Sequence, residues 1–300
     1  MNSKFSDRTK GLIAAVAATT IYGISFVIIK HSTDTADPFY LLTWRIAGGF
    51  LALTVLAALG VFKVRLKGRS LKPLILMGLF YPTLYQITEF LGVHRTTASE
   101  SAALNALIPL VGMLASTVVL KKKPLRRQVI GVIVSIAGVI AGMIGKEISA
   151  SLDVPGYLLL FAALISFGLY EVIVESASEF TTIEKIYVIM GIGTVFCLAI
   201  SLIKALAAGE LAVFASLPFQ NGYFLFVVLY LALGCSIVAC FLENYSISTL
   251  GTNGYSTLTG ICTVVTIVGS VIFLHEEFTL LQVIGVVMIL AGVLIANRES

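Results

Sequence analysis

The chain has 300 residues, of which 58% are hydrophobic and only 12% are charged. A soluble domain usually carries about 25% charged residues, so the composition excludes an ordinary water-soluble globular protein. The formal net charge of +4 becomes informative only when the charges are placed on loops.

Long apolar runs separated by short polar gaps predict an all-α, polytopic membrane protein, at about 20 residues per crossing. The first run, 11–29, is long enough to span and lacks the small-residue cleavage site of a secretory signal. The short loops leave no room for a separate soluble domain. Ten transmembrane helices are expected, at roughly 11–29, 39–61, 73–95, 98–120, 128–145, 156–177, 184–205, 222–248, 252–274 and 279–296.

One segment occurs twice. Residues 128–142 read QVIGVIVSIAGVIAG, and residues 282–296, 154 positions later, read QVIGVVMILAGVLIA. Eight of the fifteen positions are identical, including the Gln and both matched Gly. An offset of 154 residues carries five predicted helices, and because five is odd the second copy must be inverted. We therefore expect a first five-helix repeat over 1–150 and a second, inverted five-helix repeat over 151–300, as in transporters that work by alternating access.

The basic residues predict the orientation. If the helices alternate, 15 Lys and Arg share the side of the two termini, mainly in the loops 63–72 and 121–127, and 4 lie on the other side. Cytoplasmic loops carry an excess of Lys and Arg. Both termini are therefore predicted to be cytoplasmic, in a cell (inner) membrane.

The sequence resembles the drug/metabolite transporter superfamily, in particular its EamA-type ten-helix members. The resemblance rests on Arg45 in PFYLLTWRIAGG, Pro109 in NALIPLVGML, and FLHEEFTLLQVIGVVMILAGV at 273–293 with Glu276. The sequence departs from the pattern at Lys121-Lys122-Lys123 and at Thr263. The resemblance implies secondary transport of small metabolites, often export, and leaves the substrate open.

Four ionisable residues fall well inside the predicted helices: Arg45, Glu89, Glu171 and Glu243. Each costs about 2.5–3.5 kcal/mol in lipid unless it faces protein or water. Arg45 and Glu89 are expected at similar depth, as a structural ion pair or as substrate ligands. Glu89 and Glu243 are 154 positions apart, and Glu171 is expected at the depth of Glu243.

Two carboxylates that are close together in a low dielectric cannot both ionise easily. Glu171 and Glu243, with Glu89, are therefore predicted to bind a coupling proton or an amine-bearing substrate. The alternative is a wet vestibule in which these side chains have no role.

Aromatic residues, including Phe26, Phe80 and Tyr81, cluster near the same levels and suit an ammonium group, although packing or interfacial belts explain most such residues. Two asparagines either line the cavity or link helices. The candidate substrate-binding residues are Glu89, Glu171, Glu243, Trp44, Arg45, Tyr85, Tyr22, Tyr170, Asn105 and Asn244.

Pro82 and Pro109 are expected to kink two helices. Gly138 and Gly142 form a GxxxG face, mirrored by Gly292 and Ala296, for helix packing or a weak homodimer.

The other function classes find less support. The four cysteines show no CxxC spacing, and no HExxH, GxSxG or Walker motif occurs, so no enzyme, metal or cofactor is predicted. The expected partners are a small-molecule substrate, a coupling proton and the bilayer, with no nucleic acid, for a monomer or weak homodimer. The predicted function is transport of an amine or zwitterion, such as an amino acid or a quaternary ammonium compound. A channel or facilitator, or a carrier of anionic or sugar-type metabolites, is the alternative.

Overall fold

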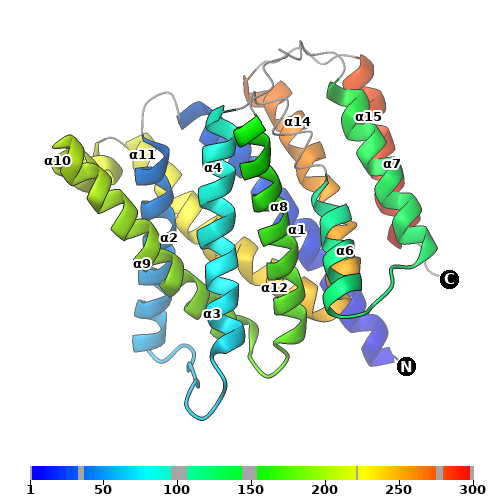
Figure 1. Ribbon diagram of the computed structural model, residues 1–300, viewed down its shortest axis with the longest axis horizontal. Helices are drawn as coiled ribbons and strands as arrows, with labels where there is room; N and C mark the ends of the chain where they lie inside the picture. The colour runs from blue at the N-terminus through cyan, green and yellow to red at the C-terminus, as the bar shows by residue number, and fades with distance from the viewer. Residues whose placement is uncertain are drawn as a thin grey trace.

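The computed structural model describes residues 2–32, 37–95, 107–143, 154–220, 222–274 and 280–297. Every regular element in these ranges is helical (Figure 1). In chain order the helices are α1 (Asn2–Ser32), α2 (Pro38–Ala58), α3 (Lys72–Gly78), η1 (Leu79–Leu84), α4 (Tyr85–Arg95), α6 (Ile108–Val119), α7 (Arg126–Met143), α8 (Val154–Ser176), α9 (Thr182–Ala208), α10 (Leu211–Ser216), η2 (Leu217–Phe219), α11 (Gly222–Leu229), η3 (Tyr230–Ala239), α12 (Cys240–Leu250), α13 (Thr252–Ser256), α14 (Gly260–Leu274) and α15 (Leu280–Asn297).

Most of these helices begin and end within a few residues of the predicted ranges. The ends of α9 show the local reasons: Thr181 and Glu184 form a capping box at its start, and Gly209 with φ 71° follows its end. The predicted helices 73–95 and 222–248 are each interrupted by a π-helical segment, η1 and η3. Pro82 lies inside η1, whereas Pro109 lies in the first turn of α6, where its missing N–H leaves no helical bond unmade.

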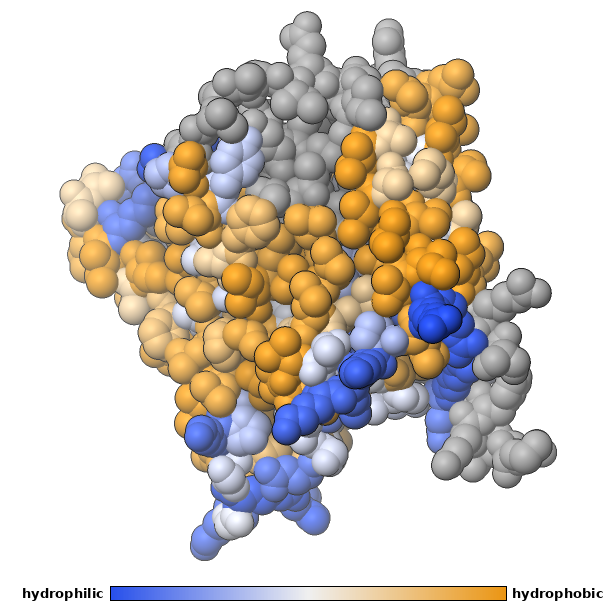
Figure 2. Space-filling view, turned by 45° about the vertical axis from the view of Figure 1, so that its right-hand side comes forward, coloured by the Kyte–Doolittle hydropathy of each residue, from blue (hydrophilic) through white to orange (hydrophobic). Residues whose placement is uncertain are grey.

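The exterior is that of an integral membrane protein. Figure 2 shows apolar side chains spread over the middle of the molecule and hydrophilic ones gathered mainly toward its lower end. Leu51, Ile203 and Leu294 expose 65%, 69% and 72% of their surface, an arrangement that is stable in lipid. Within the described residues four helices are long and apolar enough to cross a membrane, judged by length and composition: Phe39–Ala58, Val154–Ser176, Thr182–Ala208 and Gly222–Leu250.

The two copies of the duplicated segment pack against each other as α7 and α15 (Figure 1). A Cβ atom on Gly131 would collide with the backbone of Gly292, and one on Gly138 with the backbone of Gly285. Gly285 and Gly292 are the equivalents of Gly131 and Gly138 at the 154-residue offset, so the contacts are reciprocal and the two helices run antiparallel. The face containing Gly138 is thus filled from within the chain, not by a second copy.

One pair of equivalent residues also touches directly. Ser135 Oγ donates to the carbonyl of Ile289 at 3.3 Å, and the two residues are 154 positions apart in the duplicated segment.

The wider packing follows the same relation. α1 packs against α12 and α14, and α8 packs against α4 and α6, which are their counterparts. In the same way α2 contacts η3 and α9 contacts η1. Both termini and the basic loops 59–71 and 120–125 lie at the lower end of the molecule in Figure 1.

Candidate functional site

Glu243 lies in the first turn of α12, directly after η3, and its side chain is fully buried. Its Oε2 accepts a hydrogen bond of 2.7 Å from the hydroxyl of Tyr22 on α1. Its Oε1 is buried and has no hydrogen-bond donor among the described residues. A buried acceptor without a donor costs about 1–3 kcal/mol, so the structure holds this atom ready for a donor from elsewhere.

The next residue has a second such acceptor. The side-chain Nδ2 of Asn244 donates to the hydroxyl of Tyr170 at 2.8 Å and to the carbonyl of Cys240 at 2.9 Å. A carbonyl only accepts, so these bonds fix the orientation of the amide. The Oδ1 of Asn244 is then left buried without a donor in the described part of the chain.

Glu171 on α8 is the second fully buried carboxylate. The hydroxyl of Ser256, at the end of α13, lies 3.0 Å from Oε2 and 3.3 Å from Oε1, and donates its single proton there. Gly112 on α6 leaves room for this pair, because a Cβ at that position would collide with both side chains. Glu171 and Glu243 are close enough to interact electrostatically.

Four aromatic rings pack beside these residues, from η1, α4 and α8. Tyr81 and Tyr170 have ring centroids 4.7 Å apart, and Tyr85 and Phe167 are 5.2 Å apart. Tyr81 has the extended backbone angles φ −142° and ψ 125°, which interrupt the helix at η1 and place its ring in the cluster. Tyr255, also buried, is close enough to Glu243 and Glu171 to interact with both electrostatically.

Arg45 lies on α2 and Glu89 on α4, and both are half-buried. Arg45 Nε donates to Ser236 Oγ on η3 at 3.4 Å, and the guanidinium lies within electrostatic range of Glu89, Tyr81 and Tyr22. Glu89 accepts a hydrogen bond of 2.7 Å from Tyr85, one turn before it on the same helix. Arg45 and Glu89 therefore lie within electrostatic range of each other, and their roles as a structural ion pair or as substrate ligands stay predictions.

Trp44 is not directed toward these carboxylates. The indole Nε1 of Trp44 donates to the carbonyl of Phe214 at 2.8 Å, and its ring contacts Phe214 and Phe219 beside α10. Its side chain turns away from the interior because α10 and η2, two short helices absent from the predicted ranges, offer it an aromatic partner. Asn105 lies outside the residues that the structure describes.

Several residues of the site were not predicted from the sequence. Phe167 lies one helical turn before Glu171, so its spacing alone could have indicated the same face of α8. Ser256 and Tyr255 interrupt an apolar run with polar groups, which is a weaker signal. Ser236, a partner of Arg45, and Gly112 had no signal in the sequence.

Two ion pairs connect the ends of helices. Lys122, after α6, pairs with Glu175 at 2.5 Å, and Glu175 also accepts from the backbone N–H of Thr252 at 2.6 Å. Lys204 on α9 pairs with Asp37, the residue before α2. Glu175 is one turn from Glu171 on α8.

One family description matches this chain twice. The description "EamA-like transporter family" matches residues 9–143 and again residues 154–298. The Bacillus subtilis (strain 168) protein "Uncharacterized transporter YcxC" is 29% identical, over 97% of this chain and 94% of its own length. "Uncharacterized transporter YvbV" of the same organism is 23% identical, over 98% and 93%. A solved structure described as "Crystal structure of protein" has a TM-score of 0.74 at 17% identity and 96% coverage of both chains, which shows a shared fold.

Proposed function

The chain belongs to the EamA-like transporter family, and from that premise we propose that it is a secondary-active carrier that exports a small amine-bearing or zwitterionic metabolite by alternating access. The observation that carries the proposal is the pair of unpartnered acceptors, Glu243 Oε1 and Asn244 Oδ1, at the wholly buried carboxylate. The names of the family and of the relatives indicate a transporter rather than an enzyme.

The chemistry of the interior selects the ligand. The interior holds two buried acceptors, Glu243 Oε1 and Asn244 Oδ1, that have no donor among the described residues. Such acceptors favour a ligand group that only donates hydrogen bonds, and an ammonium group is one. The rings of Tyr81, Tyr85, Phe167 and Tyr170 offer π faces to a cation. Arg45 supplies one positive charge at the edge of the same region and suits the carboxylate of a zwitterion. Glu89, Tyr22 and Tyr170 complete the proposed substrate-binding set.

A proton is the proposed counter-ion. Glu171 and Glu243 interact without a basic side chain hydrogen-bonded to either one in the described ranges. Two such carboxylates in a low dielectric do not both ionise easily, so one of them holds a proton when the site is empty. Arrival of an ammonium group replaces the proton, and this exchange couples the two fluxes.

The proposed architecture is two inverted five-helix repeats, 1–150 and 151–300, that give ten spans. The direct contact between Ser135 and Ile289 supports it, as do the matched helix pairs and the two family matches. The basic loops and both termini at one end support a cytoplasmic position for that end, in a cell (inner) membrane.

The test uses the full-length protein in sealed proteoliposomes with a pH dye inside. Amino acids and quaternary ammonium compounds are compared with dicarboxylates and sugars, and counterflow exchange is measured for every compound that moves. We expect amine-dependent proton flux with counterflow. Transport confined to the acids or sugars, or flux without counterflow, contradicts the proposal.

The carboxylates are tested with Glu171→Gln and Glu243→Gln, against Glu179→Gln in the exposed turn after α8. Each buried substitution removes a charged acceptor, so we expect KM for the amine to rise about tenfold or more and the pH dependence to flatten. The Glu179 variant should match the unsubstituted protein. An unchanged KM and pH profile in both buried variants would overturn the assignment.

A further inference from the structure

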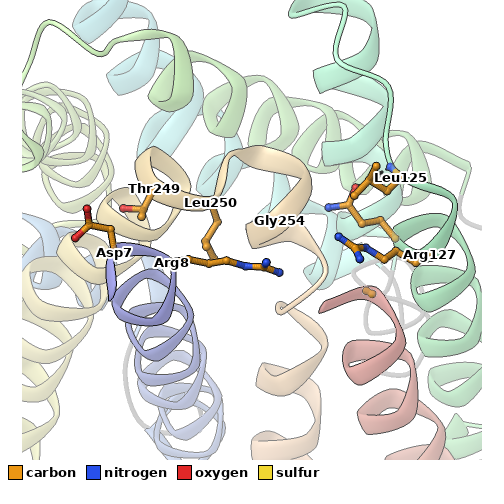
Figure 3. A pocket seen from close by; sticks show the side chains of 9 residues that line it. Asp7, Arg8, Leu125, Arg127, Thr249, Leu250 and Gly254 are labelled. Atoms are coloured by element: carbon orange, nitrogen blue, oxygen red, sulfur yellow. Dashed lines mark hydrogen bonds between the residues drawn. The ribbon is translucent and has the colours of Figure 1, made fainter. Parts of the chain in front are cut away.

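A cavity of about 400 Å³ lies beside Glu175, where the loop after α6, the end of α8 and the α12–α13 junction meet. Neither Glu171 nor Glu243 lines it. Leu250 and Gln128 line both this cavity and a larger one of about 580 Å³, which is drawn in Figure 3 with Leu250 labelled. Glu175 lines only the smaller of the two, which is referred to here as the Glu175 cavity.

The Glu175 cavity lies one helical turn from the buried carboxylate of Glu171. On each of three elements, one residue belongs to the Glu171 site and another, three or four positions away, lines the cavity. The pairs are Glu171 and Glu175 on α8, Gly112 and Ser116 on α6, and Ser256 and Asn253 on α13. Because one helical turn rises about 5.4 Å, the cavity and the Glu171 site are neighbours along these helices.

Glu175 already binds an ammonium group in this cavity. Lys122 Nζ lies 2.5 Å from Oε1 of Glu175, and the backbone N–H of Thr252 donates to Oε2 at 2.6 Å. The Lys122 side chain is 60% exposed, whereas that of Glu175 is 11% exposed. An ammonium group as exposed as this one gains little net stability from an ion pair. An amine that arrives from solution can therefore replace it at the carboxylate.

Lys123 gives the cavity an excess of positive charge. The only carboxylate among the lining residues is Glu175, and Lys123 forms no ion pair with another described residue. A ligand that is only a cation adds to the excess, whereas a zwitterion that replaces Lys122 at Glu175 brings a carboxylate for the lysines. Ser116 Oγ and Asn253 Oδ1, both buried without a partner in the described ranges, are further acceptors beside the carboxylate.

We propose that the Glu175 cavity binds a small zwitterion, such as an amino acid, and that Lys122 is its tethered competitor. The ammonium group of the ligand takes the place of Lys122 Nζ at Glu175. The carboxylate of the ligand is bound by Lys123 and by the released Lys122. The site is additional to the one proposed at Glu171 and Glu243, and binding there does not depend on the proposed transport.

The test is isothermal titration calorimetry of the purified full-length protein. The probes are 4-aminobutyrate, which is a zwitterion, n-butylammonium, which lacks the carboxylate, and butyrate, which lacks the ammonium group. Lys122→Ala removes the competitor, and Lys67→Ala, in the loop 59–71, is the control. We expect 4-aminobutyrate to bind Lys122→Ala about tenfold more tightly than it binds Lys67→Ala or the unsubstituted protein, and about tenfold more tightly than n-butylammonium binds Lys122→Ala. Butyrate should show no such gain.

Two double variants locate the ligand. Glu175→Gln added to Lys122→Ala should abolish the tenfold gain, because the ammonium group loses its carboxylate. Lys123→Met added to Lys122→Ala should make 4-aminobutyrate and n-butylammonium bind equally. No gain in Lys122→Ala, or a gain that survives Glu175→Gln, overturns the site. A preference for 4-aminobutyrate that survives Lys123→Met overturns the zwitterion as its ligand.

A further comparison separates this site from the buried carboxylates. The tenfold gain should persist when Glu171→Gln and Glu243→Gln are both present, so a failure of the proposed transport leaves it in place. A gain that disappears with those two substitutions overturns the site. If Lys122→Ala does not fold, Lys122→Arg is used, because a guanidinium keeps and strengthens the pair with Glu175. We then expect about tenfold weaker binding of 4-aminobutyrate than to the unsubstituted protein, and unchanged binding overturns the proposal.

Discussion

At the level of single residues, the hydroxyl of Tyr22 decides how the Glu243 carboxylate is oriented. It donates to Oε2 and leaves Oε1 without a donor among the described residues. In Tyr22→Phe the ring remains but the carboxylate loses its only hydrogen bond from a described residue. We expect KM for a transported amine to rise about tenfold with folding unchanged, measured in proteoliposomes. Tyr187→Phe is the control, because that hydroxyl accepts only a 3.5 Å bond from Thr54 on α2; equal KM values in the two variants would contradict the role given to Tyr22.

At the level of helices, the α7–α15 contact depends on the absence of side chains. A methyl group on Gly292 would collide with Ser135 and with the carbonyl of Gly131, so Gly292→Ala must push the helices apart. We expect a loss of about 1–3 kcal/mol and a lower Tm in detergent. Gly234→Ala is the matched change, because its Cβ would meet nothing closer than 3.7 Å. An unaltered Tm for Gly292→Ala would show that this contact does not hold the halves together.

The helices were largely predictable from the sequence, and so was one of their two interruptions. Lipid demands about 20 apolar residues per crossing, which is a strong signal, and the Thr181 and Gly209 caps are local ones. Pro82 indicated the interruption at η1, whereas η3 has no comparable signature. Tyr22 and Glu243 are 221 residues apart in the sequence, and helix packing brings them into hydrogen-bond contact. The helical spacing of the sequence contains no information about such a contact. The offset of 154 residues is the exception, since the spacing of the duplicated segment by itself relates Glu89 to Glu243.

At the scale of the whole molecule, the ends of the bundle have different charge. We expect Lys67→Cys and Lys123→Cys to react with a membrane-impermeant maleimide only after the cells are opened, and Glu210→Cys to react in intact cells. The native cysteines give little background, because Cys197, Cys235 and Cys240 are buried and Cys262 is half-buried. Labelling of positions 67 and 123 from opposite faces would contradict both the orientation and the inverted repeat.

The reciprocal contacts between α7 and α15 have a consequence for motion. Under the proposed alternating access, each half adopts the conformation that the other half has in this structure, while the contact between α7 and α15 is kept. In this conformation Glu243 is wholly enclosed while Glu89, its twin, is half-buried. Exchange of the two shapes would enclose Glu89 and uncover Glu243, so the molecule would present one acid to each side of the bilayer in turn.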